Sequence, residues 1–146
     1  MSWLDVALGL GPASMIVSGA VLAVIVRHDL QTVSLQLTTA YAAAMLTFMA
    51  GVRRGLSFRS ERFPTLPKLA TTFLYFGLAL AALAGVVLDH LQVAASALTI
   101  GFAAAMIADP IAATGGDAPF FFRRLRPPQM IVAIIGTTAL WLIAGR

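Results

Sequence analysis

The chain has 146 residues, of which 60% are hydrophobic and only 11% are charged, and its mean hydropathy is +0.91. Ordinary soluble domains carry about 25% charged residues, so this composition excludes a soluble globular protein and predicts a helical membrane protein. Ten Lys and Arg against six Asp and Glu give a net charge of +4, and the absence of cysteine excludes disulfides, thiolate catalysis and thiolate metal sites.

Five apolar segments follow one another along the chain, and we expect each to be a transmembrane helix of one all-α domain, residues 1–146. Their lengths approach the ~17–25 residues that cross the hydrocarbon, and isolated spans of this length must satisfy their own backbone groups as helices. The N-terminal stretch lacks the basic region of a secretory signal, so the first segment is expected to be retained. The predicted spans are 6–26, 33–52, 69–88, 91–108 and 130–145.

Glycine and proline give two further expectations about these spans. Gly9, Gly11 and Pro12 predict a bend or a ragged start in the first helix. The last span is the shortest, and it is expected to start earlier, near Pro127 or Pro128, since proline is favoured in a first helical turn.

The second span runs into two adjacent arginines, and basic residues set the expected orientation. Eight basic residues fall in the second and fourth loops, on the side of the N-terminus, against two on the other side. The positive-inside rule therefore predicts a cytoplasmic N-terminus in a bacterial inner membrane, with the arginine pair as the cytoplasmic stop of the second helix. The eight residues are Arg53, Arg54, Arg59, Arg62, Lys68, Arg123, Arg124 and Arg126.

The third and fourth spans are joined by the very short turn Asp89-His90, and both carry small residues at intervals of four. Small residues let helices approach closely in lipid, where no hydrophobic effect drives helices together. We therefore predict a tight antiparallel hairpin with packing ridges at Gly77, Ala81 and Gly85, and at Ala97, Gly101 and Ala105.

Motifs that carry chemistry are scarce. No ionisable residue lies at the centre of a predicted span, and there is no metalloprotease, nucleophile-elbow or phosphate-loop motif. The scattered serines and threonines are expected to bond to their own helices. Tyr41 should lie near mid-membrane, where its hydroxyl needs a partner. We expect no catalytic residues and no cofactor.

The chain has two histidines, His28 and His90, each next to an aspartate and both on the predicted outer side. Two imidazoles can hold a haem iron or part of a metal site. Loop residues in the head-group region show the same pattern, so a metal or haem site stays an alternative.

The fourth loop places three aromatic residues before three arginines. Aromatic rings suit the acyl boundary and guanidinium groups suit phosphates, so we expect Phe120, Phe121 and Phe122 to be interface anchors. The eight basic residues listed above should form one surface that contacts anionic lipid or an acidic partner. Because the basic residues sit at the ends of apolar runs, nucleic acid is not an expected partner.

The segments YAAAMLTFMAGVRRG and DAPFFFRRLRPPQMIVAIIGT resemble the domain of unknown function 3429 family, which includes transmembrane protein 69. The resemblance implies a five-span inner-membrane protein and no assigned activity. Where that family tends to have His-Trp, this chain has Arg53-Arg54. The matching positions are Tyr41, Gly51, Gly55, Asp109, Pro119, Phe120, Phe121, Leu125 and Arg126.

Three functional hypotheses follow from these patterns. The first is a non-catalytic accessory or assembly subunit of a larger membrane complex, because extramembrane loops are small and catalytic motifs are absent. The second is a small transporter or lipid-handling protein, with a cavity near Tyr41, Thr72 and Tyr75. The third is a haem- or metal-binding protein that uses the two histidines.

Overall fold

The computed structural model describes residues 3–60, 66–116, 118 and 122–146, with side chains in these ranges other than those of 3–6, 8, 59 and 60. The described residues form five α-helices, so the predicted all-α fold is confirmed. The helices are α1 (Trp3–Ile25), α2 (His28–Ser60), α3 (Leu66–Val87), α4 (Leu91–Thr114) and α5 (Phe122–Ala144).

Length and hydropathy identify four helices that are able to cross a membrane: α2 over His28–Phe58, and α3, α4 and α5 over their full lengths. The described apolar part of α1, Gly9–Ile25, is shorter. The chain is therefore a multi-pass membrane protein by the length and composition of its helices.

All five helices extend beyond the apolar segments that predicted them, and α2, α4 and α5 extend furthest. Helix α2 continues through Val52 to Ser60, α4 continues through Ala108 to Thr114, and α5 begins at Phe122, ahead of Pro127. Arginine is a good helix former, so a charged residue ends an apolar run without ending the helix. The prediction that Arg53 and Arg54 stop the second helix is therefore wrong, because both lie inside α2.

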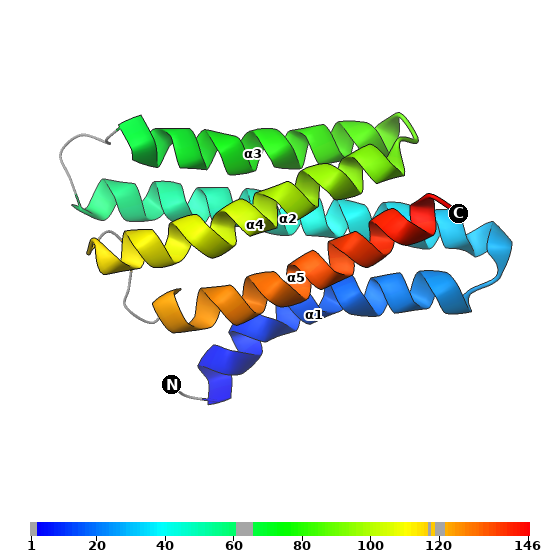
Figure 1. Cartoon of the computed structure of the whole chain (residues 1–146), viewed down its shortest axis with the longest axis horizontal. Helices are drawn as coiled ribbons and strands as arrows, with labels where there is room; N and C mark the ends of the chain where they lie inside the picture. Colours follow the sequence, from blue (N-terminus) through cyan, green and yellow to red (C-terminus); the bar gives the residue numbers. More distant parts are fainter. Residues whose placement is uncertain (1–2, 61–65, 117, 119–121) are drawn as a thin grey trace.

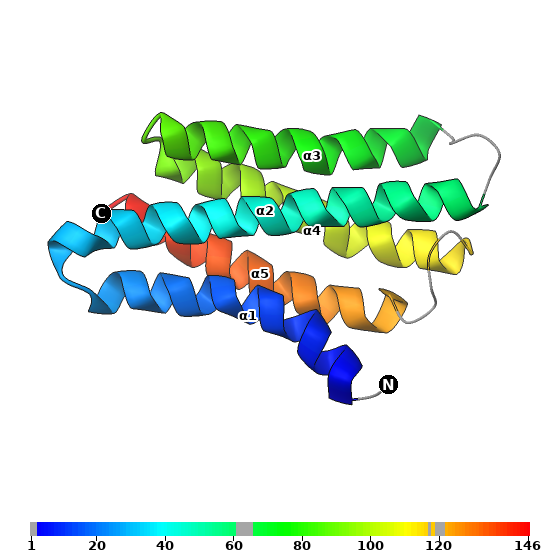
Figure 2. The same ribbon diagram turned by 180° about the vertical axis from the view of Figure 1, so that it is seen from behind.

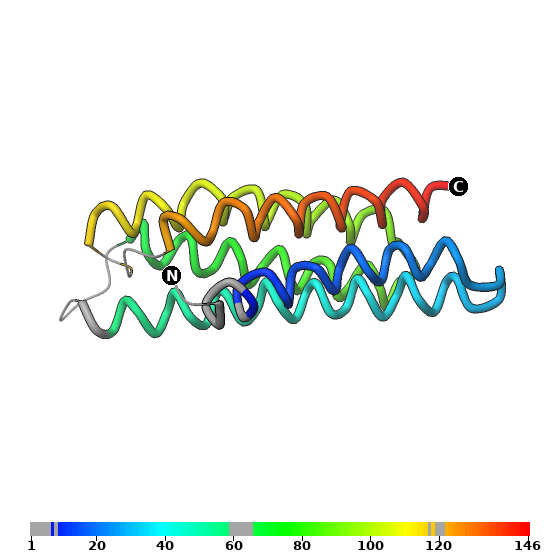
Figure 3. The backbone as a smooth tube through the Cα atoms, turned by 90° about the horizontal axis from the view of Figure 1, so that it is seen from below, coloured from blue at the N-terminus to red at the C-terminus, as the bar shows by residue number. Residues whose placement is uncertain are grey.

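The five helices pack side by side as a closed ring of neighbours, from α1 through α5 and back to α1, and α2 also contacts α4 and α5 (Figures 1 and 2). Sequential helices run antiparallel. Helices α2 and α4 end, and α3 and α5 begin, at the end of the bundle that we call the basic end, and the C-terminus lies at the opposite end (Figure 3).

Helix α1 bends in its first half, as the glycines and Pro12 predict (Figure 1). The hydroxyl of Tyr41 on α2 donates a hydrogen bond of 3.0 Å to the carbonyl oxygen of Pro12. The expectation that this phenol needs a partner is thereby confirmed, and the bond ties α2 to α1 beside the bend.

The packing ridges differ from the prediction on α3. Gly77 has open space where a Cβ would stand, and Ala81 is exposed, whereas Tyr75, Ala79, Ala82 and Gly85 form the buried face. Helical periodicity explains the difference, because positions 75, 79, 82 and 85 share one face and position 77 lies on the other. The α3 ridge is therefore shifted, and only Gly85 belongs to both versions.

On α4 the predicted ridge residues Ala97, Gly101 and Ala105 are all buried. A Cβ on Gly101 would collide with the side chain of Leu46 on α2, so this glycine lets α4 approach α2 and not only α3. Gly85 meets Ala94 and the carbonyl oxygen of His90 at the α3–α4 turn, as a tight hairpin requires.

Serine and threonine hydroxyls mostly bond to carbonyl oxygens three or four residues earlier in their own helices, as expected. Thr99 and Thr137 are the exception that links two helices, since their hydroxyls lie 2.9 Å apart between α4 and α5. These bonds satisfy the donor capacity of the hydroxyls concerned within the described part of the chain.

Candidate functional site

Asp109 lies one turn before the C-terminal end of α4, and its side chain is only 3% exposed. Its Oδ1 accepts a hydrogen bond of 2.5 Å from Nη1 of Arg53 on α2 and one of 3.1 Å from the hydroxyl of Tyr75 on α3. Its Oδ2 lies 3.3 Å from Nε of Arg126 on α5. One carboxylate thus joins four helices, and we call Arg53, Tyr75, Asp109 and Arg126 the Asp109 cluster.

Neighbouring groups hold the two arginines in place. Nη1 of Arg126 donates to Oε1 of Gln129 at 3.3 Å, and its guanidinium lies 4.4 Å from the ring centroid of Phe122. The guanidinium of Arg53 lies 5.6 Å from the ring centroid of Tyr75. Residues 122, 126 and 129 share one face of α5, so two consecutive helical turns supply both partners of Arg126. Aromatic faces attract cations at these separations.

The described part of the Asp109 cluster carries more positive than negative charge. Two guanidinium groups share one carboxylate, and Arg126 and Asp109 are almost fully buried. Buried charges are stable only when they are paired and hydrogen-bonded, and charged hydrogen bonds are about twice as strong as neutral ones. Asp109 is therefore the residue on which the pairing of both arginines depends.

A small cavity of about 20 Å³ lies beside Arg53 and Asp109. A cavity needs about 10–15 Å³ to hold a water molecule, so this one has room for a single oxygen-sized atom. Five segments line it, namely α2, α3, α4, residue 118 and the start of α5, through Arg53, Leu56, Ser57, Lys68, Asp109, Ala112, Ala118 and Phe122.

The predicted basic surface is divided by the structure. Arg53 and Arg126 turn into the bundle and pair with Asp109, and their side chains are only 14% and 9% exposed. Arg123 and Arg124 are exposed at the start of α5, and Lys68 lines the cavity. The side chain of Arg59 and all of Arg62 lie outside the described residues.

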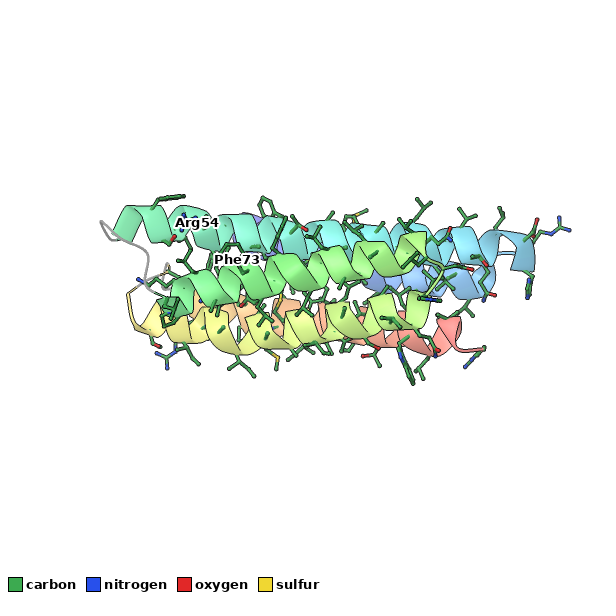
Figure 4. The ribbon with its side chains drawn as sticks, turned by 90° about the horizontal axis from the view of Figure 1, so that it is seen from above. Arg54 and Phe73 are labelled. Carbon is green, nitrogen blue, oxygen red and sulfur yellow. The ribbon has the colours of Figure 1, made fainter. Side chains whose placement is uncertain are left out.

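Arg54 contacts an aromatic ring of its own helix. Its guanidinium lies 4.3 Å from the ring centroid of Phe58, and its Nη1 is buried with no hydrogen-bond partner in the described part of the chain. Figure 4 labels Arg54 on α2 and Phe73 on the adjacent helix α3, both in the half of the bundle that contains the basic end. Phe73 is exposed, as a lipid-facing residue would be.

The predicted interface anchors fall partly outside the described residues. Phe120 and Phe121 are not described, and Phe122 is half-buried beneath Arg126. The ring of Phe122 therefore contacts the Asp109 cluster through Arg126, one turn further along α5, and its role as an interface anchor stays a prediction.

The two histidines come together at the opposite end of the bundle. His28 at the start of α2 and His90 before α4 line one open hollow of about 430 Å³, together with Asp89 and Arg146. Among the described residues no group of three His, Cys, Asp or Glu side chains could hold a metal ion. The hollow brings the imidazoles to one place, and the metal or haem alternative stays a prediction.

Sequence reasoning missed Asp109 and Tyr75 as partners of the arginines. Asp109 is followed by Pro110 and then by the apolar run Ile111–Ala113, and that run was the signal that the helix continues past the carboxylate. Tyr75 sits near the middle of an apolar span, where a phenol needs a partner, as Tyr41 does. An ionisable residue inside a span, with its partner on another helix, is a functional-site signal by default.

Comparisons of the chain with protein-family models, curated proteins and solved structures find no match. The resemblance to the domain of unknown function 3429 family therefore stays a prediction.

Proposed function

We propose that this chain is a non-catalytic, multi-pass membrane subunit that works by contacting other components of a membrane complex. The observation that carries the proposal is the Asp109 cluster. The oxygens of its carboxylate are engaged by Arg53, Tyr75 and Arg126, and the adjoining cavity admits one oxygen-sized atom. Such a cluster links four helices, and the cavity that the described residues form beside it is small.

In this proposal all five helices span the inner membrane, with the N-terminus and the basic end in the cytoplasm. The arrangement supports it, since the ends of α2 and α4 and the starts of α3 and α5 lie together (Figure 1). Lys68, Arg123 and Arg124 therefore emerge on one side, where the positive-inside rule places them in the cytoplasm.

The apolar outer surface of the described helices offers a place for a partner. Large apolar side chains such as Phe48, Phe73 and Ile100 are well exposed on α2, α3 and α4. The polar groups of the transporter alternative are instead engaged inside the bundle, because Tyr41 bonds to Pro12 and Tyr75 bonds to Asp109. Both phenol groups around which a solute path was expected therefore form hydrogen bonds within the chain.

Site-specific photo-crosslinking in native membranes tests this function. A photoreactive residue at Phe48, Phe73 or Ile100 should give a discrete crosslinked protein from at least one face of the bundle. The same residue at Phe102, which is fully buried, is the control and should crosslink only within the chain. Crosslinks to lipid alone at all three exposed positions, with a monodisperse monomer after mild solubilisation, would contradict the proposal.

A further inference from the structure

The cavity of about 20 Å³ beside the Asp109 cluster lies between one face of α2 and one face of α4. Arg53 and Ser57 are four residues apart on α2, so they share a helix face. Asp109 and Ala112 are three residues apart on α4 and likewise share a face. The cavity therefore has two polar side chains on one wall and a carboxylate on the other. Apolar side chains complete these walls, namely Leu56, Ala118 and Phe122.

Three polar side chains of the lining keep unused hydrogen-bonding capacity. In the described part of the chain Arg53 donates through Nη1, to Asp109 and Tyr75, which leaves its Nε and Nη2. The Ser57 hydroxyl donates at 2.7 Å to the carbonyl oxygen of Arg54, and its oxygen keeps acceptor sites. A carboxylate has about four acceptor sites, and three described groups contact that of Asp109. The lining therefore offers donors from Arg53 and acceptors from Ser57 and Asp109.

Charge disfavours an ion in this cavity. Lys68 also lines it, but Lys68 has an interaction of its own within the chain, so its ammonium group is not a free attraction for an anion. Asp109 contributes negative charge to the lining and would repel a halide ion in contact with its carboxylate. Mg²⁺ and Ca²⁺ need about six oxygen ligands or more, whereas two guanidinium groups already contact Asp109. A neutral molecule that both donates and accepts hydrogen bonds meets neither difficulty.

The size of the cavity restricts the neutral molecule to water. A cavity needs about 10–15 Å³ to admit a water molecule, and a buried water makes about three hydrogen bonds. The volume of about 20 Å³ therefore has room for one water and not for two, and Arg53, Ser57 and Asp109 offer the three bonds. Because purely apolar cavities stay dry, these three side chains are what makes occupancy favourable.

We propose that this cavity is a binding site for one structural water, which accepts a hydrogen bond from Arg53 and donates to Ser57 and Asp109. The water links α2 to α4 a second time, beside the direct pairing of Arg53 with Asp109. Ordered water commonly satisfies buried polar groups in this way, and a bridging water is nearly as good as a direct hydrogen bond. The site requires neither a protein partner nor a particular orientation in the membrane, so it can fail separately from the proposed function.

Overhauser effects between water and methyl protons detect such a molecule. The full chain is labelled at its leucine and alanine methyl groups and studied by solution NMR in detergent micelles. A held water gives laboratory-frame and rotating-frame effects of opposite sign, whereas freely diffusing water gives effects of the same sign. We expect opposite signs at Leu56 and Ala112, which line the cavity, and no effect at Ala79, which is fully buried on α3. Absent or same-sign effects at Leu56 would overturn the site.

Variants that fill the cavity from either wall provide the second test. Ala112→Val and Ser57→Val should each abolish the effect at Leu56, because the added methyl groups take the place of the water. Ala81→Val and Ser96→Val are the matched controls outside this cavity and should keep the effect. Ala112→Val retains the hydroxyl of Ser57, so an effect that persists in this variant would come from exchangeable protons of the chain and would overturn the site.

A last arm separates water from a halide ion. Replacing chloride with sulfate in the buffer should leave both the Overhauser effects and the methyl chemical shifts of Leu56 unchanged. A change in those shifts on removal of chloride would overturn the assignment to water in favour of the ion. None of these readouts involves a crosslinked partner, so failure of this site and failure of the proposed function are distinguishable.

Discussion

Asp109 accepts contacts from two guanidinium groups and one phenol. Because a single carboxylate serves three partners, we expect substitutions of the four residues to lower the free energy of unfolding by different amounts. Asp109→Asn removes the one anion and leaves two cations near each other, whereas Arg126→Gln leaves a neutral pair of Arg53 and Asp109. We expect Asp109→Asn to cost about 3 kcal/mol or more of unfolding free energy, since it strands buried charge. Arg126→Gln should cost about half as much.

Unfolding in mixed micelles, followed by circular dichroism, measures both costs. Asp89→Asn is the control, because Asp89 is an exposed carboxylate at the opposite end of the bundle. A larger loss of unfolding free energy for Arg126→Gln than for Asp109→Asn would show that the stability of the cluster does not depend mainly on its single carboxylate.

The two tyrosines allow a matched comparison of hydroxyl bonds. Tyr75 donates to a carboxylate and is fully buried, whereas Tyr41 donates to the backbone carbonyl of Pro12 and is half-buried. Hydrogen bonds to charged groups contribute about 1.5–3 kcal/mol and neutral ones about 0.5–1.5 kcal/mol. Tyr75→Phe should therefore lower the free energy of unfolding more than Tyr41→Phe in the same assay, and the reverse order would contradict the role of Tyr75.

The elements of the bundle differ in how far sequence predicts them. Apolar runs located all five helices, because a span in lipid needs about twenty apolar residues. The same runs missed the ends, since hydropathy reports where a helix is apolar and not where its backbone bonds stop. The additional turns of α2, α4 and α5 carry Arg53, Asp109 and Arg126. Because the predicted helices were too short, the prediction also missed this charge cluster.

Two glycines on α3 give a prediction about helix packing. A Cβ at Gly85 would stand 2.9 Å from the Cβ of Ala94 and 3.1 Å from the carbonyl oxygen of His90, whereas Gly77 has open space there. Because backbone atoms cannot move aside cheaply, Gly85→Ala should destabilise the bundle by about 1–3 kcal/mol. Gly77→Ala should be neutral or stabilise by up to about 1 kcal/mol, as a glycine in a helix interior is unfavourable.

Thermal unfolding in detergent compares these two variants directly. Equal destabilisation by both substitutions would mean that α3 also packs through the face of Gly77 in the folded protein, for example against a second chain. That outcome would restore the packing ridge that the four-residue spacing predicts.

At the scale of the whole molecule, the charge asymmetry survives the loss of two residues to the interior. Arg53 and Arg126 are committed to Asp109, yet six of the eight basic residues counted at the basic end remain, against Arg27 and Arg146 at the other end. Loop charge therefore still predicts a cytoplasmic basic end, although it did not predict that Arg53 and Arg126 pair with Asp109. Pairing across helices depends on which faces meet, and that information is spread over the whole chain.

The orientation can be tested with single cysteines, because the chain contains none of its own. His90→Cys lies in the turn between α3 and α4, and Thr114→Cys lies at the exposed end of α4, at the basic end. If the basic end faces the cytoplasm, a membrane-impermeant maleimide should label the first variant in intact cells and the second only after the membrane is permeabilised. The cysteine-free chain is the control for background labelling. Labelling of Thr114→Cys in intact cells, with His90→Cys protected, would invert the topology and place the Asp109 cluster and its cavity at the outer leaflet.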